Sequence, residues 1–324
     1  MALPIEIRSL LALPAVCAPM FLVSGPALVR EACKAGLVGG LPRQNARSFA
    51  EFDAWLGEIR VALDRHASET GKPAGPLAVN LATRVPEEEL GMHFDLCARH
   101  GVKIVITVGG DPTALIRRAH DAGLLVFHDI TSLRFAEKAI AAGADGLNCI
   151  GAGGGGHSGT VSHLALIRKV RSIYGGVIVM GGAVSDGATI RAAELLGADL
   201  AYMGTRFIAT QESMAPDAYK AMLVSQRSSD LIYTDGIAGV PANWLVQSIR
   251  MAGLDPDNLP RPIGRGMRHD HLPPGAEPWK NVWSAGQGID LIDDVPTVHD
   301  LVLRLRAEYV EACRTPDMAQ AAAG

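Results

Sequence analysis

The sequence predicts a (β/α)8 barrel, an α/β fold of parallel strands and helices, with a smaller, mostly helical subdomain inserted into it. Three observations support this prediction. The chain has 324 residues, enough for one such barrel with an addition. Short, continuously apolar runs alternate with longer amphipathic segments, and most of these segments end at a glycine. Parallel strands that are buried on both faces have this continuously apolar character.

Eight apolar runs are the predicted strands of the barrel, and the residues before them form the lead-in to the first. The runs cover residues 15–20, 38–42, 77–82, 103–109, 124–130, 146–151, 177–182 and 200–205. A doubly wound open sheet is the alternative architecture, but no G-x-G-x-x-G motif opens a helix after the first run. The regular return of strand and helix therefore favours the closed barrel.

The segments between these runs have the start and stop signals of helices. Most of them begin near serine, aspartate, proline or glutamate and end at glycine, the residue types that are preferred at the two ends of a helix. The predicted helices cover residues 25–36, 48–69, 87–101, 111–123, 132–143 and 185–197.

The alternation of strand and helix stops after residue 212. Residues 213–255 have a helical pattern, whereas 255–279 are rich in proline and glycine and predict a long loop. The apolar spacing of 295–313 predicts a closing helix that returns to the barrel. We therefore expect a barrel formed by 1–212 and 290–315, a subdomain at 213–289 on the substrate side, and a disordered tail at 316–324.

Composition excludes several classes of protein. The chain has 30 Lys and Arg against 34 Asp and Glu, with no basic stripe, so we expect no nucleic-acid partner. No apolar run approaches the about 20 residues that span a bilayer, and no signal peptide is apparent, so we expect no membrane association. The five cysteines are scattered and form no C-x-x-C pair, which predicts a cytoplasmic location and no metal site.

Glycines gather at the carboxyl ends of the last two predicted strands. One strand ends at Gly181 and Gly182, and the other at Gly204 and Thr205. Barrels of this class commonly bind a phosphate at this place, because backbone N–H groups without a neighbouring Cβ can approach it and a short helix begins there. The pair of motifs predicts a phosphorylated cofactor or substrate, with ordinary tight turns as the alternative.

A second glycine cluster, AGGGGHSG at residues 152–159, follows the sixth predicted strand and contains His157. Glycine loses more backbone entropy on folding than other residues, so such a cluster needs a reason. A flat ring system tethered by its phosphate at the last two strands would meet this loop, and side chains there would collide with it. We therefore expect the loop to lie against a cofactor, with His157 beside its reactive part.

Five motifs, in this order, resemble the nitronate monooxygenase family. They are AGGGGHSG, MGGAVSDG, GADLAYMGTRF, TDGIAGVPANWL and WSAGQG, and the resemblance extends over residues 14–310. It implies an FMN-dependent oxidoreductase on a TIM barrel with a second domain, which oxidises alkyl nitronates or nitroalkanes with O2. An NAD(P)H-dependent quinone or enoyl reductase on the same flavin scaffold is the alternative, with NAD(P)H as a transient reductant. A flavin-binding or regulatory barrel without turnover is a third possibility.

The resemblance also implies the residues of the site and a small-molecule substrate, and the exposed faces of the predicted helices would permit a homodimer. His157 matches the catalytic histidine. Neutral imidazole can accept a carbon-bound proton, and imidazolium can hold an anion. The residues matched to flavin contacts are Pro19, Met20, Phe21, Asn80, Ala82, Gly155 and Gln287, and those matched to the phosphate cradle are Met180, Gly181, Gly182, Gly204 and Thr205.

One cofactor-binding position departs from the family pattern. Well-known members of the nitronate monooxygenase family carry His-Lys at the end of the fifth strand, whereas this chain has His128 and Asp129. A carboxylate beside a flavin disfavours its anionic reduced forms unless a cation compensates, and Arg206 is the nearest candidate cation in the motifs. A His128–Asp129 proton relay at the barrel mouth is one interpretation of the pair, and a polar cap on the strand end is the other.

Overall fold

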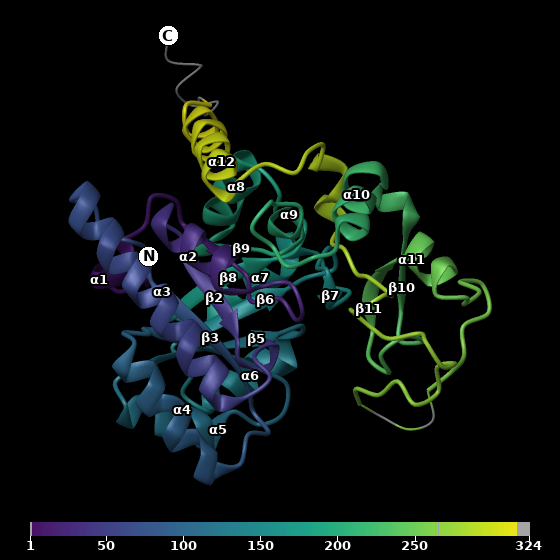
Figure 1. Ribbon diagram of the computed structural model, residues 1–324, viewed down its shortest axis with the longest axis horizontal. Coiled ribbons are helices and arrows are strands. Elements are labelled where there is room, and N and C mark those ends of the chain that lie inside the picture. Colours follow the sequence, from purple (N-terminus) through teal and green to yellow (C-terminus); the bar gives the residue numbers. More distant parts are fainter. Residues whose placement is uncertain (1, 263, 265, 316–324) are drawn as a thin grey trace.

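Eight parallel strands form a closed barrel in the computed structural model, which describes residues 2–262, 264 and 266–315 (Figure 1). Each predicted run contains one of them. In barrel order they are β1 (Ala15–Cys17), β2 (Val38–Pro42), β3 (Leu77–Ala82), β4 (Ile104–Val108), β5 (Leu125–Ile130), β6 (Gly146–Ile150), β8 (Val177–Gly181) and β9 (Leu200–Met203). Parallel pairing of β1 with β9 closes the ring, so the (β/α)8 prediction is confirmed.

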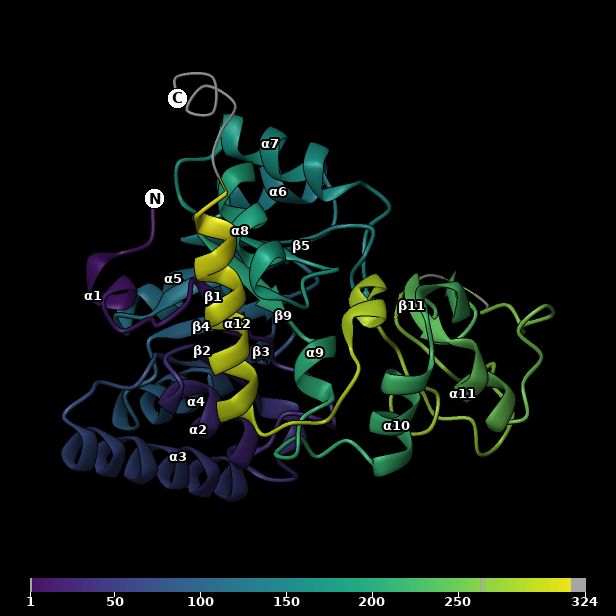
Figure 2. The ribbon, with the colours of Figure 1, turned by 90° about the horizontal axis from the view of Figure 1, so that it is seen from above.

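Helices follow the strands and surround the barrel (Figures 1 and 2). Ser48, Ser132 and Asp186 cap the amino ends of three of them by accepting a backbone N–H. The sequence prediction did not include α7. The helices around the barrel are α2 (Pro26–Lys34), α3 (Phe49–Thr70), α4 (Glu87–Arg99), α5 (Thr113–Asp121), α6 (Leu133–Ala141), α7 (His163–Ile173), α8 (Gly187–Leu196) and α12 (Val298–Cys313).

The barrel encloses a core of its own, separate from the layer between strands and helices. Alternate strand residues, among them Ala78, Phe127 and Leu200, form this inner cluster. Two residues of the lead-in join the same cluster: Leu3, which precedes the short helix α1 (Ile5–Arg8), and Ile7, which lies within it. The lead-in therefore closes the amino-terminal end of the barrel, and the carboxyl end remains as the mouth.

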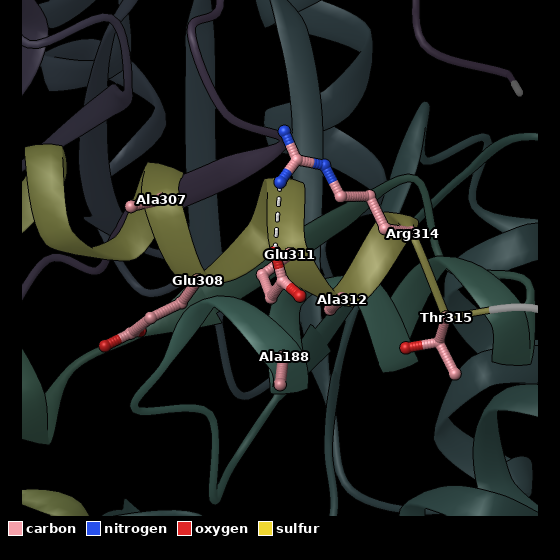
Figure 3. A pocket seen from close by; sticks show the side chains of 7 residues that line it. All are labelled: Ala188, Ala307, Glu308, Glu311, Ala312, Arg314 and Thr315. Carbon is pink, nitrogen blue, oxygen red and sulfur yellow. Dashed lines mark hydrogen bonds and ion pairs between the residues drawn. The ribbon is translucent and has the colours of Figure 1, made fainter.

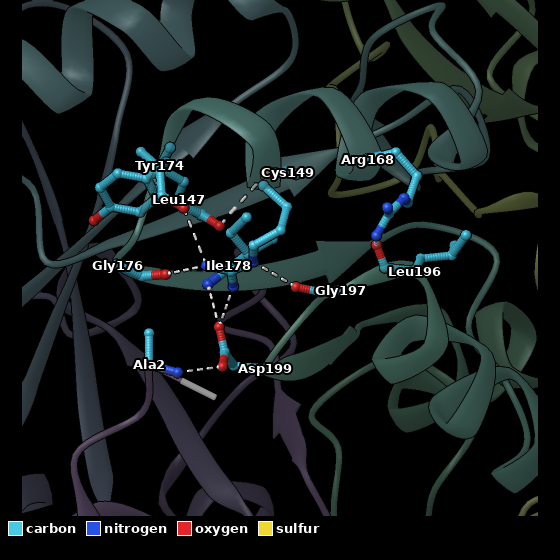
Figure 4. Close-up of polar contacts among 11 residues, drawn as sticks. Ala2, Leu147, Cys149, Arg168, Tyr174, Gly176, Ile178, Leu196, Gly197 and Asp199 are labelled. Carbon is cyan, nitrogen blue, oxygen red and sulfur yellow. Dashed lines mark hydrogen bonds and ion pairs between the residues drawn. The ribbon is translucent and has the colours of Figure 1, made fainter.

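A buried carboxylate connects the lead-in to the strands at this closed end of the barrel (Figure 4). Asp199, 2% exposed, accepts hydrogen bonds from the backbone N–H of Ala2 (2.7 Å) and of Ile178 (2.9 Å). Its second oxygen also pairs with Arg171 of α7 at 2.5 Å. One side chain therefore joins the lead-in, β8 and α7.

The inserted segment contains strands as well as helices, so it is less helical than predicted. It holds α10 (Asp217–Ser225), η2 (Ser228–Asp230), β10 (Leu231–Thr234), β11 (Ala242–Leu245), α11 (Val246–Met251) and η3 (Gln287–Leu291). Residues 242–245 were expected to be helical. They form a strand because they pair on both sides, with β10 and with the two-residue strand β7 (Gly156–His157) of the glycine-rich loop. Such partners override local propensity.

After this segment the chain returns to the barrel through α12. This helix lies against α8 and α2 (Figure 2). Contact with α8 is close at Gly187, where an added Cβ would come within 2.2 Å of the Tyr309 backbone nitrogen. The predicted tail at 316–324 lies outside the described residues. Among the residues described, no helix is long and apolar enough to span a membrane.

Candidate active site

Polar side chains form the last inward-facing layer of the barrel, at its mouth. Strand side chains alternate between the two faces, so residues two positions after Ala78, Phe127, Gly146 and Leu200 also face inward. These residues are Asn80, Asp129, Asn148 and Tyr202. Amides, a carboxyl group and a phenol therefore form the floor of the mouth, and the apolar inner cluster lies behind them toward the amino-terminal end of the barrel.

Asp129 and Asn148 form a hydrogen-bonded pair within this layer. They lie opposite each other on β5 and β6, and Asn148 Nδ2 donates to Asp129 Oδ1 at 2.7 Å. Enclosure by protein raises the pKa of Asp129 to about 7, which the hydrogen bond from Asn148 only partly opposes. Burial also raises the pKa of Tyr202 well above its usual value. Asp129 is thus the group of this layer that changes charge near neutral pH.

The structure separates Asp129 from both of its predicted electrostatic partners. His128 leaves β5 on the opposite face, where its Nδ1 lies 2.7 Å from Thr107 Oγ1. Burial lowers the pKa of His128 to about 4. Because the side chains of His128 and Asp129 lie on opposite faces of β5, the geometry does not support a proton relay between them. Arg206, 2% exposed, pairs instead with Asp294 at 3.0 Å, and it does not compensate the carboxylate.

The glycine-rich loop lies directly against the ends of β8 and β9. An added Cβ at Gly155 would come within 2.8 Å of the Gly286 nitrogen and 3.0 Å of Thr205 Oγ1. Gly182 has a positive φ of 113°, and its Cβ would lie 2.6 Å from the Gly154 nitrogen. Side chains are excluded at both positions, so the sequence needs glycine there.

Gln287 reaches the same loop from the far end of the inserted segment. Its backbone N–H donates to Gly153 O at 3.0 Å, while its side chain is exposed. The fold therefore brings Gln287 together with Gly155, Gly182 and Thr205, although they come from separate parts of the chain.

Asn243 on β11 holds the glycine-rich loop in place, although it was not among the predicted site residues. Its Nδ2, within a residue that is 3% exposed, donates to Gly154 O at 2.7 Å and Ser158 Oγ at 3.2 Å. Tyr233 of β10 donates its hydroxyl to Ser158 O at 2.8 Å. Asn243 belongs to the TDGIAGVPANWL motif, but only its pairing partner β7 reveals its role.

His157 lies on β7, where its backbone pairs with Ala242 of β11. Its ring packs edge-on against Trp279, with 5.2 Å between the ring centroids. Its Nε2 is buried and has no hydrogen-bond partner within the described chain. Burial lowers the pKa of His157 and so favours the neutral imidazole, whose Nε2 accepts or donates a proton according to the tautomer.

The donors at the mouth fit a phosphate. Within the described residues, no protein acceptor pairs with the backbone N–H groups of Gly182, Gly204 and Thr205. All three residues are partly exposed. An added Cβ at Gly204 would meet nothing closer than Met20 Sδ at 3.5 Å, so its backbone stands open. Unpaired N–H groups beside glycine are the donors that bind phosphate oxygens.

The remaining predicted residues differ in how far they reach the mouth. Pro19 and Met20 are partly exposed, and Phe21 is 40% exposed, on the loop after β1. Gly181 faces inward and Ala82 is exposed at the end of β3. The side chain of Met180 packs in the outer core instead, among residues of strands and helices, so only its backbone is near the site.

One surface hollow contains none of the predicted site residues. This hollow, between α8 and α12, is lined by Ala188, Ala307, Glu308, Glu311, Ala312, Arg314 and Thr315 (Figure 3). It lies outside the ring of strands. Across 2–262, 264 and 266–315, no three His, Cys, Asp or Glu side chains gather closely enough to hold a metal ion.

Comparison with known proteins relates most of the chain to one family. The chain matches the family model for nitronate monooxygenase over residues 61–308. Nitronate monooxygenase from Pseudomonas aeruginosa is 25% identical over 326 residues, covering 87% of this chain and 92% of that protein. A 5-hydroxy-7a-methyl-1-oxo-octahydro-1H-indene-4-carboxyl-CoA dehydrogenase from Mycobacterium tuberculosis is 31% identical over 231 residues, covering 70% of this chain and 61% of that enzyme.

Solved structures share the architecture. Nitroalkane oxidase from Streptomyces ansochromogenes superposes with a TM-score of 0.71 at 25% identity, covering 94% of this chain and 98% of that one. FabK from Thermotoga maritima gives a TM-score of 0.71 at 24% identity, covering 95% and 96%, and shows the shared fold. Because the family model matches most of its length, this chain belongs to the nitronate monooxygenase family of oxidoreductases.

Proposed function

We propose that this protein is an FMN-dependent oxidoreductase of the nitronate monooxygenase type, which oxidises alkyl nitronates or nitroalkanes with O2. The observation that carries this proposal is the set of unpaired N–H groups of Gly182, Gly204 and Thr205 at the mouth. They stand beside a glycine-rich loop that leads to His157, whose Nε2 has no hydrogen-bond partner among the described residues and whose pKa is lowered by burial. A phosphate-tailed ring system satisfies both halves of this arrangement.

The residues divide the binding of FMN between them. Gly182, Gly204 and Thr205 would hold its phosphate, the loop with Gly155 would cover its ring, and the inward layer with Asn80 would face it from inside the barrel. FMN, when bound, supplies the capacity to take electrons from the substrate and pass them to O2. The protein must position the substrate and move its proton.

His157 is the residue we propose for proton transfer. Its unpartnered Nε2 can accept the proton from the carbon next to the nitro group, because burial keeps the ring neutral. The imidazolium that forms then holds the nitronate anion. Trp279 packs against the ring, which fixes its orientation and keeps water from that side. Residues 213–289 would form the substrate side of the site.

This role predicts the behaviour of His157→Asn. Turnover of a neutral nitroalkane should fall about 100-fold or more, the usual contribution of a positioned acid–base group. Turnover of a preformed nitronate should fall less, since it has already lost the proton. FMN absorbance should be retained. The matched control is His299→Asn on the exposed face of α12, and equal turnover by His157→Asn and wild type would remove His157 from the reaction.

A second candidate function is the dehydrogenation of a CoA thioester. Two relatives at 31% and 30% identity, from Mycobacterium tuberculosis and Rhodococcus jostii, carry the name of such a dehydrogenase. The exposed Phe21 and Leu22 on the loop after β1 offer apolar surface for an acyl group. The alternative of NAD(P)H-dependent reduction of a quinone or enoyl substrate uses the same flavin site.

One anaerobic experiment separates these functions. The FMN-loaded protein is mixed with a nitronate, a cyclic acyl-CoA, NADH or NADPH, and bleaching of flavin absorbance is followed. Rapid bleaching by the nitronate alone supports the first proposal, and bleaching by the thioester or by the nicotinamide supports the second or the reductase. A protein that takes up no FMN contradicts all three.

A further inference from the structure

The carboxyl–carboxamide pair at the barrel axis contains an unused hydrogen-bonding atom. Asn148 is 1% exposed, and its Nδ2 donates to Asp129 Oδ1. Its Oδ1 is buried and, among the described residues, has no partner. A buried amide oxygen without a donor costs about 1–3 kcal/mol, so its presence in the last inward layer indicates a group that binds there.

No other charge nearby fixes the state of Asp129. Tyr202 on β9 and Cys149 on β6 are the titratable groups whose pKa the Asp129 carboxylate affects, and burial raises the pKa of both, so neither supplies a charge to Asp129. His128 points to the other face of β5. Arg206 is engaged with Asp294. Within the described chain, the protonation of Asp129 is therefore set by its enclosure and by Asn148.

The two protonation states of Asp129 favour opposite orientations of Asn148, because only the protonated carboxyl group has an O–H to donate. An ionised carboxylate only accepts, so Asn148 directs its NH2 to Asp129 and leaves Oδ1 free, as observed. A protonated carboxyl donates its O–H, and Asn148 satisfies it by turning its amide about the last side-chain torsion. That turn places the NH2 where Oδ1 was. Both states are accessible near neutral pH, because the pKa of Asp129 is raised to about 7.

We infer that Asp129 and Asn148 form a protonation-driven hydrogen-bond switch below the mouth. With Asp129 ionised, the pair presents an acceptor, Asn148 Oδ1, to the bound group, and with Asp129 protonated it presents a donor. The inference rests on the proposed function only for the identity of that group, the flavin ring, whose edge carries both donors and acceptors. Asp129 is thus a positioning residue that acts through Asn148.

The switch is tested first without any ligand. In the apoprotein, the side-chain amide resonances of Asn148 should titrate as one proton with a midpoint near pH 7, following Asp129. In Asp129→Asn this titration should disappear. The control is Asp111→Asn, an exposed carboxylate on the same rim after β4, in which the titration should persist. Asn148 resonances that stay constant from pH 5.5 to 8.5 in wild type would overturn the inference.

Ligand binding then tests the consequence. Riboflavin is the probe, because it lacks the phosphate, whose own titration would overlap. Its Kd should change roughly tenfold between pH 5.5 and 8.5 in wild type and in Asp111→Asn, since one buried hydrogen bond is gained or lost. In Asp129→Asn it should change less than about twofold. Parallel pH profiles for wild type and Asp129→Asn would contradict the switch.

The two experiments separate the inference from the proposed function. A titrating Asn148 in a protein that binds neither riboflavin nor FMN keeps the switch and removes the flavin site. A flavin-binding protein in which Asn148 does not titrate keeps the site and removes the switch.

Discussion

The carboxyl group of Asp129 lies where burial disfavours its ionised form, and ionisation therefore lowers the stability of the folded protein. Its pKa is raised from 3.8 to about 7 in the folded state. The folded state therefore binds more protons than the unfolded state between these two pH values. Stability falls as the pH rises through this window and stays lowered above it.

This linkage predicts the stability of Asp129→Asn. The variant has no proton to lose at this position. Its unfolding free energy should therefore increase relative to that of wild type from pH 4 to pH 7, and the difference should then stay constant. Urea unfolding of the apoproteins at pH 4.5 and pH 8 measures the difference. An equal difference at both pH values would mean that the folded pKa of Asp129 is not raised.

At the same scale, two residues of the inward layer were missed by the sequence prediction, although alternation along the predicted strands contains the signal for them. Asn148 and Tyr202 lie within the predicted runs 146–151 and 200–205, two residues after inward neighbours, so their direction follows from the strand period. Asn243 and Trp279 could not be found in this way. Their contacts with the glycine-rich loop and with His157 depend on pairing between segments far apart in sequence.

At the scale of elements, the strands of the barrel were predictable because each is continuously apolar and buried on both faces. The short strands β7, β10 and β11 were not, since a strand of two to four residues has no period of its own. Their partners decide their conformation: β11 pairs with β10 on one side and with His157 and Gly156 on the other.

The contact between α8 and α12 predicts a difference between two glycines. An added Cβ at Gly187 would come within 2.2 Å of Tyr309 N and 2.3 Å of Leu305 O, so α12 must move. Gly187→Ala should therefore destabilise the protein by about 1–3 kcal/mol. At Gly175 an added Cβ meets no atom within 4 Å, and Gly175→Ala should be neutral or slightly stabilising.

Denaturant unfolding of both variants checks this prediction. Circular dichroism near 222 nm reports the helices. Tryptophan fluorescence reports the inserted segment through Trp244, Trp279 and Trp283, and helix α3 through Trp55. Equal unfolding free energies for Gly187→Ala and Gly175→Ala would show that α12 tolerates displacement at this contact.

For the whole molecule, closure of the barrel at its amino end depends on one buried side chain. Asp199 joins the lead-in, β8 and α7 through Ala2, Ile178 and Arg171 (Figure 4). Asp199→Asn keeps the shape but leaves Arg171 without its anion, and should cost about 3 kcal/mol of unfolding free energy. Asp257→Asn, on an exposed turn, is the control. A cost below that of the control would show that the lead-in closes the barrel by apolar contacts alone.

The glycine-rich loop is one edge of a sheet whose other strands belong to the inserted segment. Residues 213–289 therefore cannot be exchanged as an independent cassette. A chimera with this segment from a relative would also receive that relative's β11, which pairs with the strand that carries His157. It would also receive the relative's residue in place of Asn243, which hydrogen-bonds the glycine-rich loop. Substrate range and acid–base chemistry would be inherited together, and engineering one without the other requires changes within the proline- and glycine-rich stretch that leave Trp279, the ring neighbour of His157, unchanged.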